Sequence, residues 1–291
     1  MNTTPAVEVP AVRSGSHFGA FLGEAAKVTA FLRRDFLVAW SYRMSFFSEI
    51  AGMFVQAITF YFVGLMVNDS VLPTYGGENV TYMEFAAVGI AFGAFISVGL
   101  GQVATAVRQE QLMGTLESLL MTPTSPATIQ AGSVAYPLLF LPLRTGVFLA
   151  LIAFAFGLDF APGGLAPAAL VFLLFTPFVW GLGLLSAAGV MTFKRGTAGI
   201  GFGVALLVLT SGAYFPLELL PRFVELVAEF NPLAVAIGGV RDALLGNAGW
   251  HSLSAEVFLL VPMGAASLAA GVTAFRLAVR RERARGTIGL Y

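Results

Sequence analysis

The chain has 291 residues, of which 57% are hydrophobic and 11% are charged, and its formal net charge is zero. Soluble domains carry about 25% charged residues, so this composition excludes an ordinary soluble protein, and the balanced charge excludes the basic surface that nucleic-acid binding requires. The chain has no cysteine, and its two histidines, His17 and His251, lie far apart, so the sequence predicts neither disulfides nor a metal site built on these residues.

The first 45 residues divide into a tail and a helix. Residues 1–16 have no apolar run, so we expect a disordered cytoplasmic tail rather than a cleaved signal peptide. Residues 17–45 place apolar side chains on one helical stripe, with Lys27 and Arg34 off it; the stripe comprises Phe18, Phe21, Leu22, Ala25, Leu32, Phe36 and Trp40. Such an amphipathic helix is expected to lie in the membrane interface, with packing on protein as the alternative.

Residues 46–279 contain six apolar stretches long enough to cross a membrane. A helix rises about 1.5 Å per residue and the hydrocarbon core is about 30 Å thick, and each stretch meets that length. They are Phe46–Val67, Glu84–Val107, Ala131–Gly157, Leu165–Thr192, Thr197–Phe215 and Ala255–Phe275. The sequence therefore predicts an all-α polytopic membrane protein with six transmembrane helices.

The positions of lysine and arginine predict the orientation. One side of the predicted membrane holds Arg13, Lys27, Arg33, Arg34, Arg43, Arg108, Lys194, Arg195, Arg276, Arg280, Arg281, Arg283 and Arg285. The other side holds only Arg222 and Arg241, and Arg144 lies within a span. Because positive charge is retained in the cytoplasm, both termini are expected there, and residues 280–291 form a basic cytoplasmic tail.

A short polar helix is predicted between the second and third spans, at about residues 108–122. Its apolar face comprises Leu112, Met113, Leu116, Leu119 and Leu120, and its other face Glu110, Gly114, Glu117 and Ser118. Pro123 and Pro126 end it. A cytoplasmic helix joined to two spans suits mechanical coupling to a partner; an ordinary amphipathic loop helix is the alternative.

The stretch at about residues 216–246, after the fifth span, is too apolar for a solvated loop and too interrupted for a span. Pro216, Pro221 and Pro232 break it. Two short helices that enter the membrane part-way from outside would explain both facts, provided that protein or a water-filled cavity covers the broken backbone.

Both segments resemble those of ABC-2 family exporter permeases. "EQLMGTLESLLMTPTSP" is similar to the family's coupling segment, with Gly114, Thr115, Leu116, Glu117, Thr122, Pro123 and Pro126 matching. "YFPLELLPRFVELVAEFNPLAVAIGGVRDALLG" resembles its external re-entrant hairpin, with Phe215-Pro216, Leu220-Pro221, Asn231-Pro232 and Arg241 in the usual order. The resemblance covers roughly residues 18–291.

The resemblance implies the transmembrane half of an ATP-driven exporter in the cell (inner) membrane. It implies a dimer with a second copy of this permease or a related one, and two ABC ATPase subunits that bind ATP and Mg and contact Glu110, Leu112, Met113, Gly114, Thr115, Leu116 and Glu117. The residues themselves agree, since neither Lys27 nor Lys194 stands in a G-x-x-x-x-G-K-[ST] loop. We therefore expect no enzyme activity and no cofactor in this chain.

Few polar residues fall inside the predicted spans. Gln56, Gln102 and Arg144 are the candidates for a substrate pathway, and Glu49 lies near a span end, where a carboxylate can reach the interface. Arg144 stands at mid-span, where a charge is costly, so it is expected to face the protein, either in a structural ion pair or carbonyl clamp or against an anionic headgroup or the hairpin.

The glycine pairs Gly89 with Gly93 and Gly199 with Gly203 predict close helix approach, within the chain or between two copies. With so little polar surface, the predicted substrate is an amphipathic or lipid-like molecule such as a drug, lipid or glycolipid, moved outward. A stand-alone channel or secondary carrier is the alternative, which an internal repeat or buried carboxylate pairs would favour.

Overall fold

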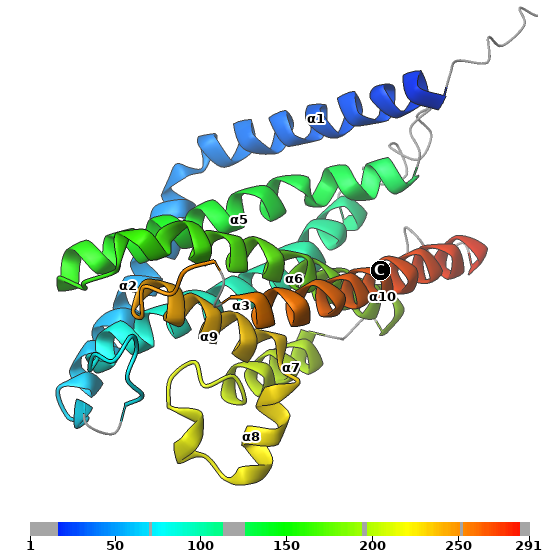
Figure 1. Cartoon of the computed structure of the whole chain (residues 1–291). Helices are drawn as coiled ribbons and strands as arrows, with labels where there is room; N and C mark the ends of the chain where they lie inside the picture. The colour runs from blue at the N-terminus through cyan, green and yellow to red at the C-terminus, as the bar shows by residue number, and fades with distance from the viewer. Residues whose placement is uncertain (1–16, 70–71, 113–125, 194–196, 251–252, 286–291) are drawn as a thin grey trace, which may run out of the picture.

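The computed structural model describes residues 17–69, 72–112, 126–193, 197–250 and 253–285, and these residues form a helical bundle (Figure 1). The helices are α1 His17–Ser41, α2 Arg43–Gly64, α3 Tyr82–Leu112, α5 Pro126–Phe156, α6 Leu165–Phe193, α7 Thr197–Leu209, α8 Arg222–Glu229, α9 Pro232–Leu244 and α10 Ser254–Arg285, with short 3-10 turns η2 Pro162–Gly164 and η3 Leu217–Leu219. The β contact in the described ranges is an isolated bridge between Tyr75 and Glu78.

Four stretches of the described helices are long and apolar enough to cross a membrane. They are Tyr82–Gly101, Leu139–Phe156, Pro162–Thr192 and Ser254–Glu282, and they coincide with four of the six predicted spans. The prediction of a polytopic all-helical membrane protein is therefore confirmed.

The two other predicted spans are shorter in the structure. The apolar part of α2 is Ile50–Gly64, and α7 has 13 residues, or about 20 Å at 1.5 Å per residue. The bent pair α8 and α9 counts as a fifth span only if it is taken as one broken helix. The count of six spans stays a prediction.

Successive long helices run in opposite directions along the bundle. Figure 1 shows α3, α6 and α10 ending at one end of the bundle, where α5 and α7 begin. The ends of α3, α6 and α10 are therefore at the end of the bundle that is predicted to face the cytoplasm.

Helix α1 matches the predicted amphipathic helix but ends at Ser41, since the chain bends at Tyr42 before α2 begins. It packs along α5, where Phe36 and Phe140 bring their ring centroids within 5.7 Å. Its C-terminal Trp40 is 65% exposed. One side of α1 therefore packs on protein, as the alternative prediction for this helix states. The position of α1 in the membrane interface stays a prediction.

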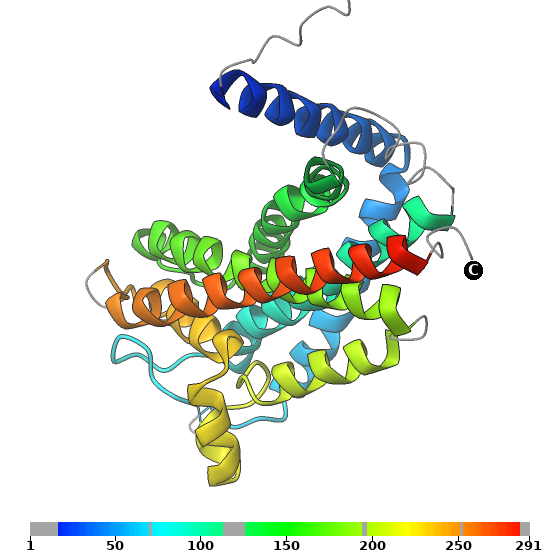
Figure 2. The ribbon, with the colours of Figure 1, turned by 90° about the vertical axis from the view of Figure 1, so that its right-hand side faces the viewer.

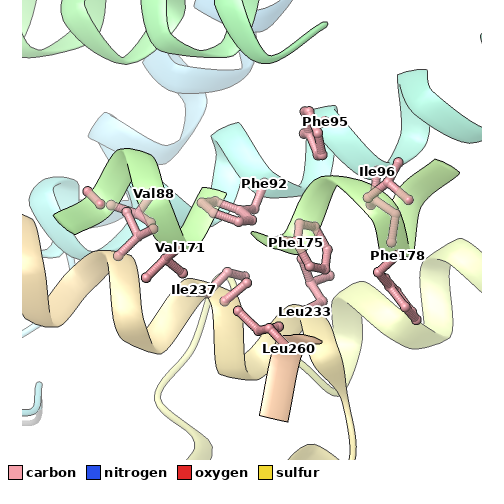
Figure 3. Packing of buried hydrophobic residues seen from close by; sticks show 14 of the residues in the cluster. Val88, Phe92, Phe95, Ile96, Val171, Phe175, Phe178, Leu233, Ile237 and Leu260 are labelled. Carbon is pink, nitrogen blue, oxygen red and sulfur yellow. The ribbon is translucent and has the colours of Figure 1, made fainter. Parts of the chain in front are cut away.

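The core lies between α3, α6, α9 and α10. Phe92 and Phe95 of α3 pack against Phe175 of α6, and Ile237 of α9 closes the same cluster (Figure 3). All four side chains are fully buried. Helix α9, which is too short to span, is thus held inside the bundle by aromatic side chains on both of its long neighbours.

Glycine allows two of the long helices to touch through their backbones. A Cβ on Gly181 of α6 would meet the backbone of Ser267, and a Cβ on Gly271 of α10 would meet that of Gly181. Ser267 adds a hydrogen bond, donating from Oγ to the Phe178 carbonyl at 3.0 Å. Small residues at such crossings let spans pack closely in lipid, where no hydrophobic force drives them together.

The predicted glycine pairs differ in their surroundings. Gly89 lies against the backbone of Ala213, and Gly93 lies beside the Tyr214 hydroxyl, so this pair serves packing within the chain. A Cβ on Gly203 would meet nothing within 4 Å. A role for the α7 pair in contact between two copies stays a prediction.

Candidate functional site

A cleft of about 600 Å³ lies between α2, α3 and α7. Its α3 wall repeats small residues along one helical face, and its α7 wall does the same. The lining residues are Gln56 of α2; Gly93, Ala94, Ser97, Leu100, Gly101 and Thr105 of α3; Gly201, Val204, Ala205 and Val208 of α7; and Tyr214. The volume falls in the range of small-molecule sites, roughly 300–1,000 Å³.

The cleft extends toward the end of α3 from which the predicted coupling segment departs. Thr105 and Gly201 line that end, whereas Gln56, Gly93 and Tyr214 line the other. A molecule in the cleft would therefore touch the helix that leads directly into residues 108–122.

The described residues that line the cleft offer few polar groups, and these are uncharged. Gln56, Ser97, Thr105 and Tyr214 supply them, and the Ser97 hydroxyl already donates to the Gly93 carbonyl at 2.7 Å. Because the rest of the wall is glycine, alanine, valine and leucine, the cleft suits a mostly apolar molecule with a small polar part.

Gln56 and Tyr214 meet at one end of the cleft. The Gln56 amide nitrogen donates to the Tyr214 hydroxyl at 3.4 Å. The Tyr214 ring stacks on Phe60 with ring centroids 4.7 Å apart and planes inclined by 16°. Its carbonyl accepts a hydrogen bond of 3.0 Å from the Tyr82 hydroxyl. Tyr214 is thus held by α2 through its ring and by α3 through its backbone.

The structure places two of the three predicted pathway residues. Gln56 lines the cleft, whereas Arg144 is half-buried on α5 and is not among the described residues that line it. Gln102 belongs to α3, but its side chain lies outside the described part of the structure.

The coupling residues fall largely outside the described residues. Glu110 and Leu112 stand in the last turn of α3, whereas Met113, Gly114, Thr115, Leu116 and Glu117 belong to residues 113–125, outside the described ranges. The coupling assignment stays a prediction.

The predicted hairpin consists of two helices with a sharp break. Helices α8 and α9 are bent by 84° relative to each other, and Figures 1 and 2 show α8 projecting from the bundle while α9 returns into it. Pro221 precedes α8 and Pro232 begins α9, as the proline positions indicate.

Asn231 stabilises the break. Its side-chain oxygen accepts from the Leu233 amide at 3.0 Å, which caps α9. Its amide nitrogen donates to the Leu207 carbonyl at 2.8 Å and to the Thr210 hydroxyl at 3.0 Å. One buried side chain therefore satisfies the start of α9 and the end of α7, which explains why an Asn-Pro pair suits this position.

Arg241 does not lie on an exposed loop, although the charge count assigned it to the outer side. It is 4% exposed and binds three backbone carbonyls. Nε and Nη2 donate to Phe85 at 3.1 and 2.9 Å, Nη2 also donates to Ala213 at 2.9 Å, and Nη1 donates to Gly212 at 2.9 Å. The guanidinium also covers the Phe85 ring, 3.5 Å from its centroid. We call this arrangement the Arg241 clamp.

Tyr75, in the connection between α2 and α3, lies next to the Arg241 clamp and interacts with its guanidinium. Burial raises the pKa of the Tyr75 hydroxyl, and the nearby Arg241 charge offsets this only in part. The phenol therefore stays neutral at physiological pH. Gly76 and Gly77, both at positive φ, make the tight turn that brings Tyr75 into position.

Sequence reasoning missed Tyr214, Phe85 and Tyr75. Tyr214 stands directly before the Phe215-Pro216 pair that marks the start of the hairpin. Phe85 contributes a main-chain carbonyl, for which the side-chain sequence carries no signal.

The chain is similar in sequence to known membrane transport proteins. The sequence profile of a family described as "ABC-2 type transporter" matches residues 26–245. The linearmycin resistance permease protein LnrN of Bacillus subtilis (strain 168) is 28% identical over 184 residues, which cover 62% of this chain and 47% of that protein. The inner membrane transport permease YadH of Escherichia coli (strain K12) is 26% identical over 197 residues, 66% of this chain and 74% of YadH. The matched part of the chain thus spans about half the length of LnrN.

Proposed function

Because the chain belongs to the ABC-2 type transporter family and is a multi-pass membrane permease, we propose that it is the transmembrane subunit of an ATP-driven exporter. An amphipathic or lipid-like substrate would enter the cleft between α2, α3 and α7 and leave on the outer side. The observation that carries this proposal is the cleft itself, which has apolar walls, a few uncharged polar groups, and one end next to the helix that continues into residues 108–122.

Residues 108–122 would form the contact with the ATPase. Glu110 and Leu112 end α3 on the side of the bundle where α5 begins, so a partner that grasps this segment would move α3, one wall of the cleft. ATP and Mg would bind to that partner, since the lysines of this chain do not form a phosphate-binding loop. Two such ATPases and a second copy of this permease, or a related one, would complete the exporter.

We assign the membrane to the level of the four long spans, with both termini cytoplasmic and the hairpin outside. Helix α8 supports this placement, because it exposes apolar side chains next to the carboxylates of Glu225 and Glu229. These apolar side chains are Phe223, Leu226 and Val227, and Phe230 directly after the helix is exposed as well. A short amphipathic helix of this kind suits the boundary between headgroups and acyl chains, and α9 would extend from it into the bundle.

Single cysteines introduced at successive positions of residues 216–246 test this placement, since the natural chain has no cysteine. In intact cells, an impermeant maleimide is expected to label the exposed positions of α8, such as Glu229, and to leave buried α9 positions, such as Ala236, unlabelled. A control cysteine at Arg276 should react only after the cells are opened. Labelling of position 229 only in opened cells would reverse the topology, and uniform labelling along the segment would indicate a solvated loop.

Transport through the cleft is tested with the permease and its ATPase reconstituted in proteoliposomes. Ala205→Trp places an indole in the cleft and is expected to lower ATP-dependent uptake of a fluorescent lipid analogue into inside-out vesicles by about tenfold, a barrier change of about 1.4 kcal/mol. Ala150→Trp is the matched control, because Ala150 is exposed on α5 and does not line the cleft.

Two results would contradict the proposal. Equal transport by the two tryptophan variants would show that the substrate passes elsewhere. Transport that continues without ATP and without the ATPase would instead identify a stand-alone channel or carrier.

A further inference from the structure

We call the end of the cleft formed by Gln56 and Tyr214 the recognition point, because the hydrogen bond between these side chains suits ligand binding better than stabilisation of the fold. The hydrogen bond between the two side chains is long, at 3.4 Å, compared with about 2.9 Å for a strong bond of this type. The residues are 158 positions apart and come from different walls. A weak bond between two walls of a cleft can be exchanged for bonds to a ligand at little cost.

Tyr214 is fixed independently of this bond. Phe60 stacks on its ring, the Tyr82 hydroxyl holds its carbonyl, and Gly93 leaves room beneath it, where a Cβ would stand 3.1 Å from the phenol oxygen. The hydroxyl therefore keeps its place whether or not Gln56 is bound to it. A preorganised polar group of this kind favours binding, since no ordering cost is incurred on association.

The chemistry of the two side chains defines the ligand class. A tyrosine hydroxyl both donates and accepts, and a glutamine amide offers two N–H donors and one carbonyl acceptor. Among the described residues that line the cleft, none has a charged side chain. A charged headgroup would thus lose hydration without gaining a counter-ion, which is costly, whereas hydroxyl or amide groups could satisfy both side chains.

We propose that Gln56 and Tyr214 bind the uncharged hydroxyl- or amide-bearing headgroup of an amphiphile whose apolar part lies along the α3 and α7 walls. This inference rests on the proposed function, since it names the class of molecule that the cleft accepts. Gln56 and Tyr214 would then determine the specificity of the cleft. Ser97 would contribute less, because its hydroxyl already donates to the Gly93 carbonyl.

The test measures occupancy of the cleft directly in the full-length chain in lipid nanodiscs. Ala94→Cys provides a single thiol on the cleft wall, and its rate of modification by a maleimide reports whether the cleft is filled. Three probes with the same alkyl chain are compared: decyl maltoside, decyl sulfate and decyltrimethylammonium. Decyl maltoside is expected to protect the thiol at the lowest concentration.

Variants then assign the selectivity to the two side chains. Gln56→Leu and Tyr214→Phe are each expected to raise the half-protecting concentration of decyl maltoside by up to about tenfold, the effect of one hydrogen bond, and to leave that of decyl sulfate unchanged. Gln56→Glu should reverse the preference toward decyltrimethylammonium, a gain that misfolding cannot produce. Thr273→Val, on the exposed face of α10 and not among the residues that line the cleft, is the control and should leave all three values unchanged.

The outcomes separate the inference from the proposed function. Equal protection by the three probes, or an unchanged maltoside value in both Gln56→Leu and Tyr214→Phe, would overturn the recognition point while leaving the cleft as a binding site. Absence of protection by every probe would overturn both, because the cleft would then hold no amphiphile.

Discussion

Arg241→Met is expected to lower the free energy of unfolding by about 3 kcal/mol, because it leaves three backbone carbonyls without their donors in the interior of the bundle. Arg241 makes four hydrogen bonds to the carbonyls of Phe85, Gly212 and Ala213. A hydrogen bond to a charged group contributes about 1.5–3 kcal/mol, but the methionine also removes the cost of burying the guanidinium, so the net loss is smaller than the sum of the four.

Thermal unfolding in detergent, followed by the loss of the monodisperse peak on size exclusion, measures this effect. A loss of 3 kcal/mol corresponds to a decrease in Tm of about 6–12 °C for a protein of this size. Arg241→Lys should give a smaller decrease, since an ammonium has three donors but cannot reproduce the planar fork of the guanidinium.

Arg222→Met is the matched control, because Arg222 is exposed at the start of α8, and it should leave Tm unchanged. A Tm for Arg241→Met equal to that of the control would show that the clamp does not hold the fold.

The Arg241 clamp also bears on the cleft, because one of its acceptors, Ala213, directly precedes Tyr214. We therefore expect Arg241→Lys, which retains the fold, to bind amphiphiles in the cleft more weakly.

The long helices could be predicted because their apolar residues run without interruption. The fourth predicted span, Leu165–Thr192, and α6, Leu165–Phe193, differ by one residue at one end. The break in the hairpin was also predictable, since Pro232 cannot continue a helix and Asn231 can cap the next one. In both cases the information is local in the sequence.

The end of α7 could not be predicted from apolarity. The span was expected to continue to Phe215, but the helix ends at Leu209. The hydroxyls of Thr210 and Ser211 donate to the Leu206 and Val208 carbonyls, and Gly212 adopts a positive φ of 68°. These local bonds compete with helix continuation, and the turn they make places Tyr214 in the cleft.

The candidate site was predictable only in part, because its contacts join distant segments. Gln56 was identified as an interior polar residue, but its partner stands 158 positions away. A carbonyl clamp was considered for Arg144, and the structure shows that chemistry at Arg241, whose acceptors lie 156, 29 and 28 positions away. Main-chain acceptors leave no trace in a sequence, so no reading of residue types could have paired them.

Gly114→Pro is expected to abolish the stimulation of ATP hydrolysis by substrate while the permease still inserts in the membrane. A proline within a helix costs about 3 kcal/mol relative to alanine, because it removes a backbone donor and its ring clashes with the preceding turn. The predicted helix at residues 108–122 is short, so a cost of this size would disrupt it, whereas Gly114→Ala should be tolerated and serves as the control.

Glu117→Ala tests the same contact without changing the backbone. On the predicted helix Glu117 shares the polar face with Glu110 and Gly114, opposite Leu116, so its removal should weaken binding of the ATPase rather than unfold the segment. The measurement is the ATPase rate of the reconstituted complex with and without decyl maltoside, together with the amount of ATPase that co-purifies. We expect the stimulated rate of both variants to fall to the basal rate. Wild-type stimulation in both would exclude this segment as the coupling element, and the contact with the ATPase would then have to be sought in residues 194–196 or the basic tail.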